Sequence, residues 1–334
     1  MSILLQAENV TVEFSPQGSP IRGRPSRNQF TALAGVSFAL AERETLGIVG
    51  ESGSGKTTLV RAIVGMVPVQ DGRIVWMGSD ISRADPNSRR RIRKDMSMIF
   101  QNPLASLNPR MTIGQIIAEP CQIHEPHASR AEIRRRVAET MEWVGLSPAL
   151  VNRYPHEFSG GQCQRVGIAR ALIARPRLII CDEPVAALDV SIRAQIVNLL
   201  KQLQDEFGIS MIMISHDLSV IRHVSHQIMV MYLGHVMEMI PSGHLLHKSS
   251  HPYTRTLIES IPVPDPKIQK TREIPVIVGE APSMRNPSSG CRFSTRCPIA
   301  RDFCNDSRPA LLEAGPGHWI ACPYCKMRTR PESA

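Results

Sequence analysis

A glycine-rich run lies near residue 50, between two stretches of opposite character. Residues 50–57, Gly-Glu-Ser-Gly-Ser-Gly-Lys-Thr, fit the pattern G-x-x-x-x-G-K-[ST]. The apolar residues 45–49 before the run predict a buried strand, and residues 57–66 after it predict a helix that ends near Pro68. A strand, a glycine-rich turn and a helix in this order form a cradle of backbone N–H groups at the positive end of a helix dipole. The run therefore predicts an α/β fold that binds the phosphates of a nucleotide.

Each side chain of this phosphate loop has an expected task. Lys56 should reach the β and γ phosphates of ATP, and the Thr57 hydroxyl should sit on Mg²⁺. ATP and Mg²⁺ are therefore the expected cofactors. The other expected phosphate-binding positions are Gly50, Glu51, Ser52, Gly53, Ser54, Gly55 and Thr58.

A second apolar stretch ends in two carboxylates. Residues 178–181 predict a buried strand that is followed by Asp182 and Glu183. On its own, an acidic pair at a strand end is equally compatible with an ordinary capped strand. In a chain with a phosphate loop, we expect Asp182 to coordinate Mg²⁺, directly or through water, and Glu183 to polarise the attacking water. Cys181 is expected to be a core side chain rather than a reactive thiol.

The rest of the chain divides into two parts that differ in their residue patterns. Strand-like and helix-like stretches alternate as far as residue 235, which is the α/β pattern. Beyond residue 236, proline becomes frequent, and five of the eight cysteines fall after residue 290, so we expect a separate, loop-rich C-terminal module. Ser129 is expected to cap one helix and Gly145 to follow its end. The further expected strands are 3–14, 36–40 and 209–214, the expected helices are 129–144, 162–173 and 192–206, and 15–29 is an expected loop.

Composition excludes several classes of protein. The sequence has no apolar window of about 18 residues, so no transmembrane helix is expected. The N-terminal residues lack a basic region and a cleavage signature, so we expect no secretory signal and a reducing compartment, where cysteines stay thiols or metal ligands. The formal charge is +9, but only 4% of the residues are aromatic, which leaves little surface for base stacking. Nucleic acid is therefore not an expected partner.

A second motif, Phe-Ser-Gly-Gly-Gln at residues 158–162, is followed by Gln164 and Arg165. This run resembles the signature motif of the ABC-type ATPases, with phenylalanine where leucine is usual. The resemblance implies a P-loop NTPase ABC nucleotide-binding domain, with a RecA-like core, an antiparallel β subdomain and a helical signature subdomain. It also implies a head-to-tail dimer of two cassettes, in which each signature contacts the ATP held by the other chain. The implied signature contacts are Phe158, Ser159, Gly160, Gly161 and Gln162.

The same resemblance implies roles for four more residues. Phe14 matches the aromatic residue that stacks on adenine, and a strand-end core phenylalanine is the alternative interpretation. Gln101 matches a residue that touches Mg²⁺ or water, and Asp189 lies in the loop that crosses the dimer interface. His216 matches the switch histidine at the γ-phosphate, so it is an expected catalytic residue together with Glu183.

The C-terminal module carries a subfamily signal. Residues 251–254, 279–283 and 290–293 resemble the C-terminal extension of oligopeptide, dipeptide and nickel importer ATPases. The resemblance covers essentially the whole chain, with the nucleotide-binding domain expected at 1–235 and the extension at 236–334. It implies a peripheral subunit on the cytoplasmic face of the bacterial inner membrane. The implied partners are a second ABC ATPase subunit (a paralogue or the same chain), two transmembrane permeases and an extracytoplasmic substrate-binding protein.

The function that the resemblance implies is ATP hydrolysis that powers the import of di- or oligopeptides. Nickel complexes or opine-like compounds are alternative cargoes for the same machine. A soluble ABC-type ATPase that acts on nucleic acid or ribosomes is the alternative from another class. Such proteins usually carry paired cassettes or a long coiled-coil insertion, whereas this chain has one phosphate loop, one signature and no sustained heptads.

The cysteines of the C-terminal module bear on a metal site. Cys291, Cys297, Cys304 and Cys322 are separated by 5, 6 and 17 residues. Structural zinc usually uses short C-x₂₋₄-C pairs, and the sequence offers one such pair, Cys322 with Cys325. The resemblance to the dipeptide branch, in which some members carry a [4Fe–4S] cluster on cysteines so spaced, favours iron–sulfur. Zinc and unligated thiols are the alternatives to an iron–sulfur cluster, and Cys325 is an alternative ligand to Cys322. We expect the metal site to have a structural role rather than a redox-sensing one.

Overall fold

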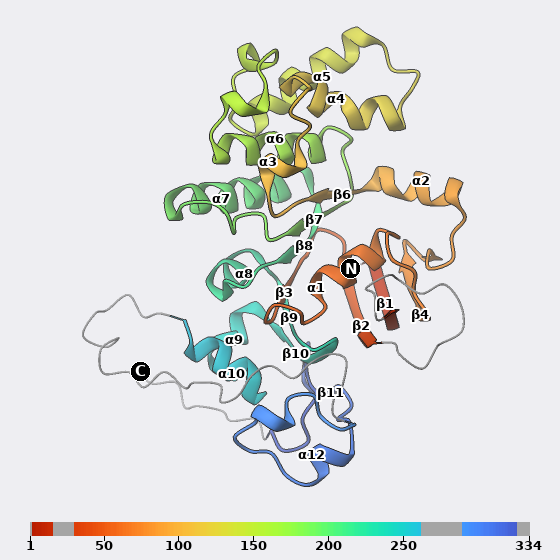
Figure 1. Ribbon diagram of the computed structural model, residues 1–334, viewed down its shortest axis with the longest axis vertical. Helices are drawn as coiled ribbons and strands as arrows, with labels where there is room; N and C mark the ends of the chain where they lie inside the picture. Colours follow the sequence, from red (N-terminus) through yellow and green to blue (C-terminus); the bar gives the residue numbers. More distant parts are fainter. Residues whose placement is uncertain (1, 16–29, 262–288, 326–334) are drawn as a thin grey trace, which may run out of the picture. The chain divides into compact units, whose positions relative to one another are not determined.

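The computed structural model describes residues 2–15, 30–261 and 289–325. The chain divides into two compact units, whose elements are labelled in Figure 1. The first unit comprises residues 1–4, 40–45 and 83–215, and the second comprises residues 5–39, 46–82 and 216–334. Two features of the sequence analysis lie outside the described residues, namely residues 16–29 of the expected loop and the segment 279–283.

Three parallel strands form the base of the first unit, in the order β8-β7-β6. These strands are β6 (Met96–Ile99), β7 (Leu178–Asp182) and β8 (Ser210–Ile214). Every residue of β8 and all but the last residue of β7 are buried, which explains why both strands are continuous apolar runs rather than alternating ones. The helices are α2 (Pro86–Asp95), α3 (Pro103–Ser106), α4 (Ile113–His124), α5 (Arg130–Trp143), α6 (Gly160–Leu172) and α7 (Val190–Phe207), with short 3-10 turns η1 (Pro148–Leu150) and η2 (Pro155–Glu157).

Local capping explains where the helices of the first unit begin and end. Ser129 precedes α5, and its Oγ accepts a hydrogen bond from the Glu132 N–H at 3.2 Å. Gly145 follows the end of α5 with φ 71°, a left-handed conformation that glycine adopts without strain. Both expectations for this helix are therefore confirmed. Helices α4 and α6 begin with the reciprocal form of the same cap, in which the third residue of the helix also accepts from the cap N–H.

The second unit contains strands of two sheets. One sheet has the order β2-β1-β4-β5, and β4 is antiparallel to both of its neighbours. The other sheet contributes five strands to this unit, in the order β11-β12-β10-β9-β3. Strand β3 is parallel to β9, and the remaining pairs are antiparallel. The strands are β1 (Ile3–Phe14), β2 (Phe30–Ala41), β3 (Thr45–Val49), β4 (Asp71–Trp76), β5 (Ser79–Asp80), β9 (Gln227–Tyr232), β10 (His235–Pro241), β11 (Leu312–Gly315) and β12 (His318–Ile320).

Short helices complete the second unit. Helix α1 follows β3 directly after the glycine-rich run, so the expected order of strand, turn and helix is confirmed. The helices are α1 (Lys56–Ile63), α8 (Leu218–Val224), α9 (Leu245–Lys248), α10 (Pro252–Glu259) and α12 (Phe303–Asp306), with 3-10 turns η3 (Ser242–His244) and η4 (Ser294–Arg296).

The expected elements agree with the observed ones to within a few residues, with one exception. The stretch 36–40 is only part of β2, which begins at Phe30. Strand β2 lies beside β1, a strand of 12 residues, and this long neighbour allows β2 to extend well beyond its most apolar part. The expected helices at 162–173 and 192–206 correspond to α6 and α7.

A buried carboxylate joins the C-terminal residues to the second unit. Glu238 on β10 has no exposed surface, and its carboxylate accepts hydrogen bonds from the N–H groups of Ser250 at 2.8 Å and His251 at 3.2 Å. The same carboxylate contacts the His318 Nε2 atom at 2.7 Å. His318 lies on β12, and β12 pairs with β10. Residues 289–325 are therefore attached to this sheet by backbone pairing and by a side-chain contact.

Candidate functional site

The phosphate loop holds its lysine over the loop backbone. Lys56 is buried, and its Nζ donates hydrogen bonds to the carbonyl oxygens of Gly50 at 2.7 Å and Glu51 at 2.9 Å. Its Nζ also donates to the Ser54 hydroxyl at 3.3 Å. The ammonium group therefore lies at the centre of the loop, where the loop wraps around it. The contact of Lys56 with the β and γ phosphates stays a prediction.

Two glycines of the loop cannot carry a side chain. Gly50 has φ 154°, and a Cβ atom there would lie 2.2 Å from the Met231 carbonyl oxygen. Gly55 has φ 101°, and its Cβ would lie 2.7 Å from the Ala32 carbonyl oxygen. Gly55 also precedes α1, which has no side-chain cap. A helix N-terminus that follows a glycine turn in this way can receive an anion on its N–H groups.

The C-terminal residues brace the phosphate loop through contacts that sequence analysis did not find. The Tyr253 hydroxyl accepts a hydrogen bond from the Glu51 N–H at 2.9 Å. The Glu51 carboxylate pairs with Arg296 Nη1 at 2.9 Å, and this nitrogen also donates to the Tyr232 hydroxyl at 3.0 Å. The Arg296 side chain is 9% exposed, and Tyr253 is fully buried. The resemblance at residues 251–254 marked Tyr253 as notable, but nothing in the sequence indicated its contact with the loop.

We expect this brace to tune nucleotide affinity. Replacing Arg296 with glutamine removes the charge that pairs with Glu51, so the loop should hold its binding shape less firmly. The expected result is about tenfold weaker ATP binding, because one charge-assisted hydrogen bond at a partly buried site is lost. Titration with a fluorescent ATP analogue measures the effect. Arg301→Gln, an equal charge change at an exposed site of the same module, is the control, and unchanged affinity in Arg296→Gln would contradict the brace.

The first unit brings together two residues that sequence analysis singled out. Gln101 follows β6 and Glu183 follows β7, and these strands are parallel neighbours with Ile99 opposite Cys181. Their carboxyl ends meet, and the Gln101 Nε2 group donates a hydrogen bond to Glu183 Oε2 at 3.0 Å. Glu183 has φ 50°, and its N–H donates to the Ile214 carbonyl oxygen at 3.0 Å. Such a left-handed residue at the end of a buried strand is a sign of function rather than of packing.

Two other expected nucleotide contacts lie at element ends. His216 is exposed and follows β8, one residue before Asp217, whose side chain caps α8 by accepting from the Ser219 N–H at 2.9 Å. Phe14 ends β1 and is partly exposed, and its ring stacks on the ring of Phe30 with centroids 5.6 Å apart. The structure therefore adds Phe30 as a second aromatic residue beside Phe14, and the adenine contact stays a prediction.

The signature motif is exposed at the start of α6. The Ser159 Oγ accepts from the Gln162 N–H at 3.3 Å, while the Gln162 side-chain oxygen accepts from the Ser159 N–H at 2.9 Å. Ser159, Gly160 and Gln162 are all exposed. A Cβ atom at Gly161 would lie 2.6 Å from Ile192 of α7, so glycine allows the two helices to approach closely there. Asp189, at the N-cap position of α7, is also exposed.

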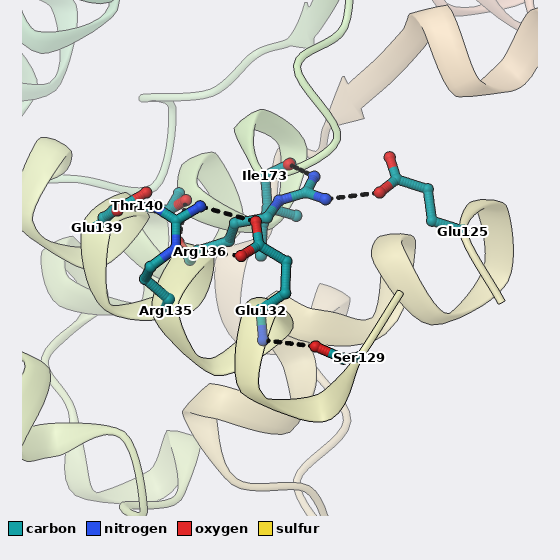
Figure 2. Close-up of polar contacts among 8 residues, drawn as sticks. All are labelled: Glu125, Ser129, Glu132, Arg135, Arg136, Glu139, Thr140 and Ile173. Atoms are coloured by element: carbon teal, nitrogen blue, oxygen red, sulfur yellow. Dashed lines mark hydrogen bonds and ion pairs between the residues drawn. The ribbon is translucent and has the colours of Figure 1, made fainter. Parts of the chain in front are cut away.

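Arg136 contacts the carboxyl end of α6, the signature helix, which begins with the signature motif (Figure 2). Arg136 on α5 donates to the carbonyl oxygen of Ile173, the C-cap of α6, at 2.5 Å, and pairs with Glu125 at 2.6 Å. In return, Arg165 on α6 donates to the carbonyl oxygen of Val144, the C-cap of α5, at 2.6 Å. Helices α5 and α6 thus cap one another. Cationic donors at these ends satisfy free carbonyl groups and complement the helix dipoles.

Removal of Arg136 is expected to loosen the signature helix. Its side chain is 15% exposed, so Arg136→Ala should lower the free energy of unfolding by about 2–3 kcal/mol through the loss of two charge-assisted hydrogen bonds. Arg135 next to it is 60% exposed and pairs only with Glu132 and Glu139 among the described residues, so Arg135→Ala should lower the free energy of unfolding far less than Arg136→Ala does. Urea unfolding curves measure both values, and equal effects for the two variants would contradict a special role for Arg136.

The cysteines of the C-terminal module influence one another's pKa values. Burial and the charges of neighbouring thiols raise the pKa of Cys297 to about 11 and also raise the pKa of Cys291. A hydrogen bond from the Cys325 thiol lowers the pKa of Cys322. Within the described ranges, however, no three histidine, cysteine or acidic side chains are placed to hold one metal ion. The arrangement gives no support to the zinc alternative and none, by itself, to an iron–sulfur cluster. Cys181 is buried as expected, and burial raises its pKa to about 12.

Comparisons with known families cover both parts of the chain. Residues 33–186 match the ABC transporter family, and residues 237–304 match the family described as oligopeptide/dipeptide transporter, C-terminal region. The oligopeptide transport ATP-binding protein OppF of Escherichia coli (strain K12) is 53% identical over 321 residues, which cover 96% of each chain. The OppF protein of Haemophilus influenzae is 49% identical with the same coverage, and the oligopeptide transport ATP-binding protein AppF of Bacillus subtilis is 49% identical over 87% of this chain and 88% of its own.

Solved structures show the same fold. A dimeric ATP-binding cassette, MJ0796, in a post-hydrolysis state with ADP and Pi, matches with a TM-score of 0.63 and 29% identity, covering 72% of this chain and 99% of its own. The cbiO1 protein of Clostridium perfringens matches with a TM-score of 0.66 over 81% of this chain and 98% of its own, at 24% identity. None of the helices in the described ranges has the length and apolar character needed to span a bilayer.

Proposed function

Because the chain belongs to the ABC transporter family, in its oligopeptide/dipeptide branch, we propose that it hydrolyses ATP to power the import of di- or oligopeptides. The chain is an ABC-type ATP-binding cassette in fold. The observation that carries the proposal is its identity of 53%, over nearly its whole length, to an oligopeptide transport ATP-binding protein. Nickel complexes and opine-like compounds are the alternative cargoes.

The residues proposed to contact ATP are those of the phosphate loop, together with residues that were singled out in the sequence at the ends of other strands. The loop residues, from Gly50 to Thr58, bind the phosphates, with Lys56 at the β and γ phosphates. Thr57, Asp182 and Gln101 are the proposed groups around Mg²⁺, which supplies charge stabilisation on the phosphates when it is bound. His216 contacts the γ-phosphate, and Phe14 stacks on the adenine.

Glu183 is the proposed general base. Its carboxylate accepts a proton from the attacking water while the water approaches the γ-phosphate. The hydrogen bond from Gln101 Nε2 to Glu183 Oε2 at 3.0 Å supports this role, because it orients the carboxylate. The left-handed backbone at Glu183 supports it further, since strain of this kind is retained where a side chain must be aimed.

Completion of the site requires a second cassette in this proposal. The signature residues Phe158 to Gln162 stand at the exposed N-terminus of α6, as a group that contacts a partner's ATP must. Asp189 and the neighbouring Val190, which is 79% exposed, form a surface suited to the same interface. The further proposed partners are two transmembrane permeases and an extracytoplasmic substrate-binding protein, with the chain peripheral on the cytoplasmic face of the bacterial inner membrane.

The proposed division of the chain places the nucleotide-binding domain at 1–235 and the importer-type extension at 236–334. A match to the C-terminal family that begins at residue 237 supports this boundary. The cofactor proposed for the extension is a [4Fe–4S] cluster on Cys291, Cys297, Cys304 and Cys322. Its support is the spacing of these cysteines, which resembles that of cluster-bearing members of the dipeptide branch. Iron, sulfide and the visible spectrum of anaerobically purified protein test it, and colourless, iron-free, folded protein would reject it.

Uptake by cells that lack this gene tests the transport function. Complementation with the wild-type chain should restore uptake of a labelled tripeptide, and Lys56→Ala should not restore it. Uptake of nickel or of an opine, in place of the peptide, would select one of the alternative cargoes. Unchanged peptide uptake in the deletion strain, together with salt-sensitive nucleic-acid binding by the purified chain, would favour the soluble ATPase instead.

A further inference from the structure

The second unit contains a cavity of about 700 Å³ that is separate from the phosphate loop. Strands β1, β2 and β10 contribute to its lining, as do residues 291–292 and 308–311 of the C-terminal module. Most of its lining is apolar and includes Phe38, Met237 and Trp319. A cavity of this size with few polar groups is typical of a site for a small organic molecule.

Among the polar side chains that line the cavity, two arginines lie around one histidine. Arg292 Nε donates to His235 Nε2 at 3.0 Å, and Arg308 Nη2 contacts His235 Nδ1 and also donates to the Ala34 carbonyl oxygen. Burial and the two arginine charges lower the pKa of His235 to about 3, so the imidazole is neutral near pH 7. A neutral imidazole has one acceptor nitrogen and one N–H. The imidazole can therefore accept a hydrogen bond from one of the two guanidinium groups. The other guanidinium group faces the imidazole N–H, which is itself a donor.

Among the described residues, the two guanidinium groups also have no acidic partner. In the described part of the chain, no ion pair involves Arg292 or Arg308, and Arg292 Nη1 is buried without a hydrogen-bond partner. The acidic residue that lines the cavity, Glu8, is paired with Arg73 at 2.5 Å. Arg308 is exposed, whereas Arg292 is partly buried, and a partly buried cation with an unmatched donor is costly unless an acceptor is present.

We propose that this cavity binds a small organic carboxylate with an apolar body. The carboxylate accepts hydrogen bonds from Arg292 and Arg308 and supplies a negative charge beside them. His235 then has to accept a hydrogen bond from only one of the two guanidinium groups. The apolar body packs along Phe38, Met237 and Trp319. An inorganic anion would satisfy the arginines but leave the apolar walls without contacts, so the lining favours an amphipathic ligand.

Binding of 4-phenylbutyrate to the full-length protein tests the proposal. Saturating Mg-ADP is added so that the nucleotide site is occupied, and binding is followed by titration calorimetry and saturation-transfer NMR. We expect one molecule of the acid per chain, and binding of the matched alcohol, 4-phenylbutanol, that is at least tenfold weaker. Arg292→Gln and Arg308→Gln should each weaken binding of the acid by about tenfold or more, because each removes a charge-assisted hydrogen bond.

Two further variants keep the result interpretable if an arginine variant unfolds. Ala310→Trp adds a bulky side chain at an exposed lining position and should block the acid while both arginines stay in place. Arg301→Gln, outside the lining, should bind the acid as the wild type does, and Mg-ADP affinity reports on the fold of every variant. Equal binding of acid and alcohol, inorganic phosphate binding as tightly as the acid, or full binding by Arg292→Gln would each overturn the proposal.

Discussion

Replacing Glu183 with glutamine is expected to lower the rate of ATP hydrolysis by about 10²–10⁴-fold, the usual contribution of a general base. Glutamine has nearly the same shape, and its side-chain oxygen can still accept the hydrogen bond from Gln101, which measures 3.0 Å in the wild type. It cannot accept a proton from water, so the chemical step alone should fail. ATP should therefore bind normally and hold two cassettes together in a closed dimer.

Three measurements separate this result from general damage to the protein. Phosphate release gives the turnover rate, a fluorescent ATP analogue gives the affinity, and size-exclusion chromatography with ATP shows the trapped dimer. Glu142→Gln, at an exposed position of α5, is the matched control and should leave all three unchanged. Turnover near the wild-type rate in Glu183→Gln would refute the role of Glu183, and a loss of ATP affinity would assign this residue to binding.

Replacing Glu238 with alanine is expected to lower the free energy of unfolding by about 3–5 kcal/mol. The substitution leaves the buried N–H groups of Ser250 and His251 without their acceptor and removes the contact with His318. Each unsatisfied buried group carries its full desolvation cost, because water cannot reach it. The loss is large because one carboxylate serves three partners from two separate segments, residues 250–251 and His318.

Urea unfolding of the full chain measures this loss. Glu313→Ala, at an exposed position of β11, is the matched control and should change stability by less than about 0.5 kcal/mol. Glu238→Gln should fall between the two variants, because its amide oxygen accepts only part of the hydrogen bonds. A cost of 1 kcal/mol or less for Glu238→Ala would show that the three donors find other acceptors.

Local signals in the sequence were sufficient for the elements that carry the expected motifs. The phosphate loop needs glycine at Gly50 and Gly55, where the backbone conformation leaves no room for a side chain. The glycines of the sequence motif therefore predict this loop conformation. The same is true of Ser129 and Gly145 at the ends of α5, and of Ser159 at the start of α6. These features concern contacts within a few residues, which a single sequence records directly.

The long-range contacts came only from the tertiary structure. Tyr253 and Arg296 contact Glu51 across more than 200 residues of sequence, and no periodicity or spacing encodes such a pair. The unmatched arginines around His235 likewise come from separate segments. The sequence by itself thus determined the chemistry of the phosphate loop and the family of the chain, because these depend on local motifs. Only the folded structure decided which distant side chains meet, because burial and charge pairing act between whatever residues the packing brings together.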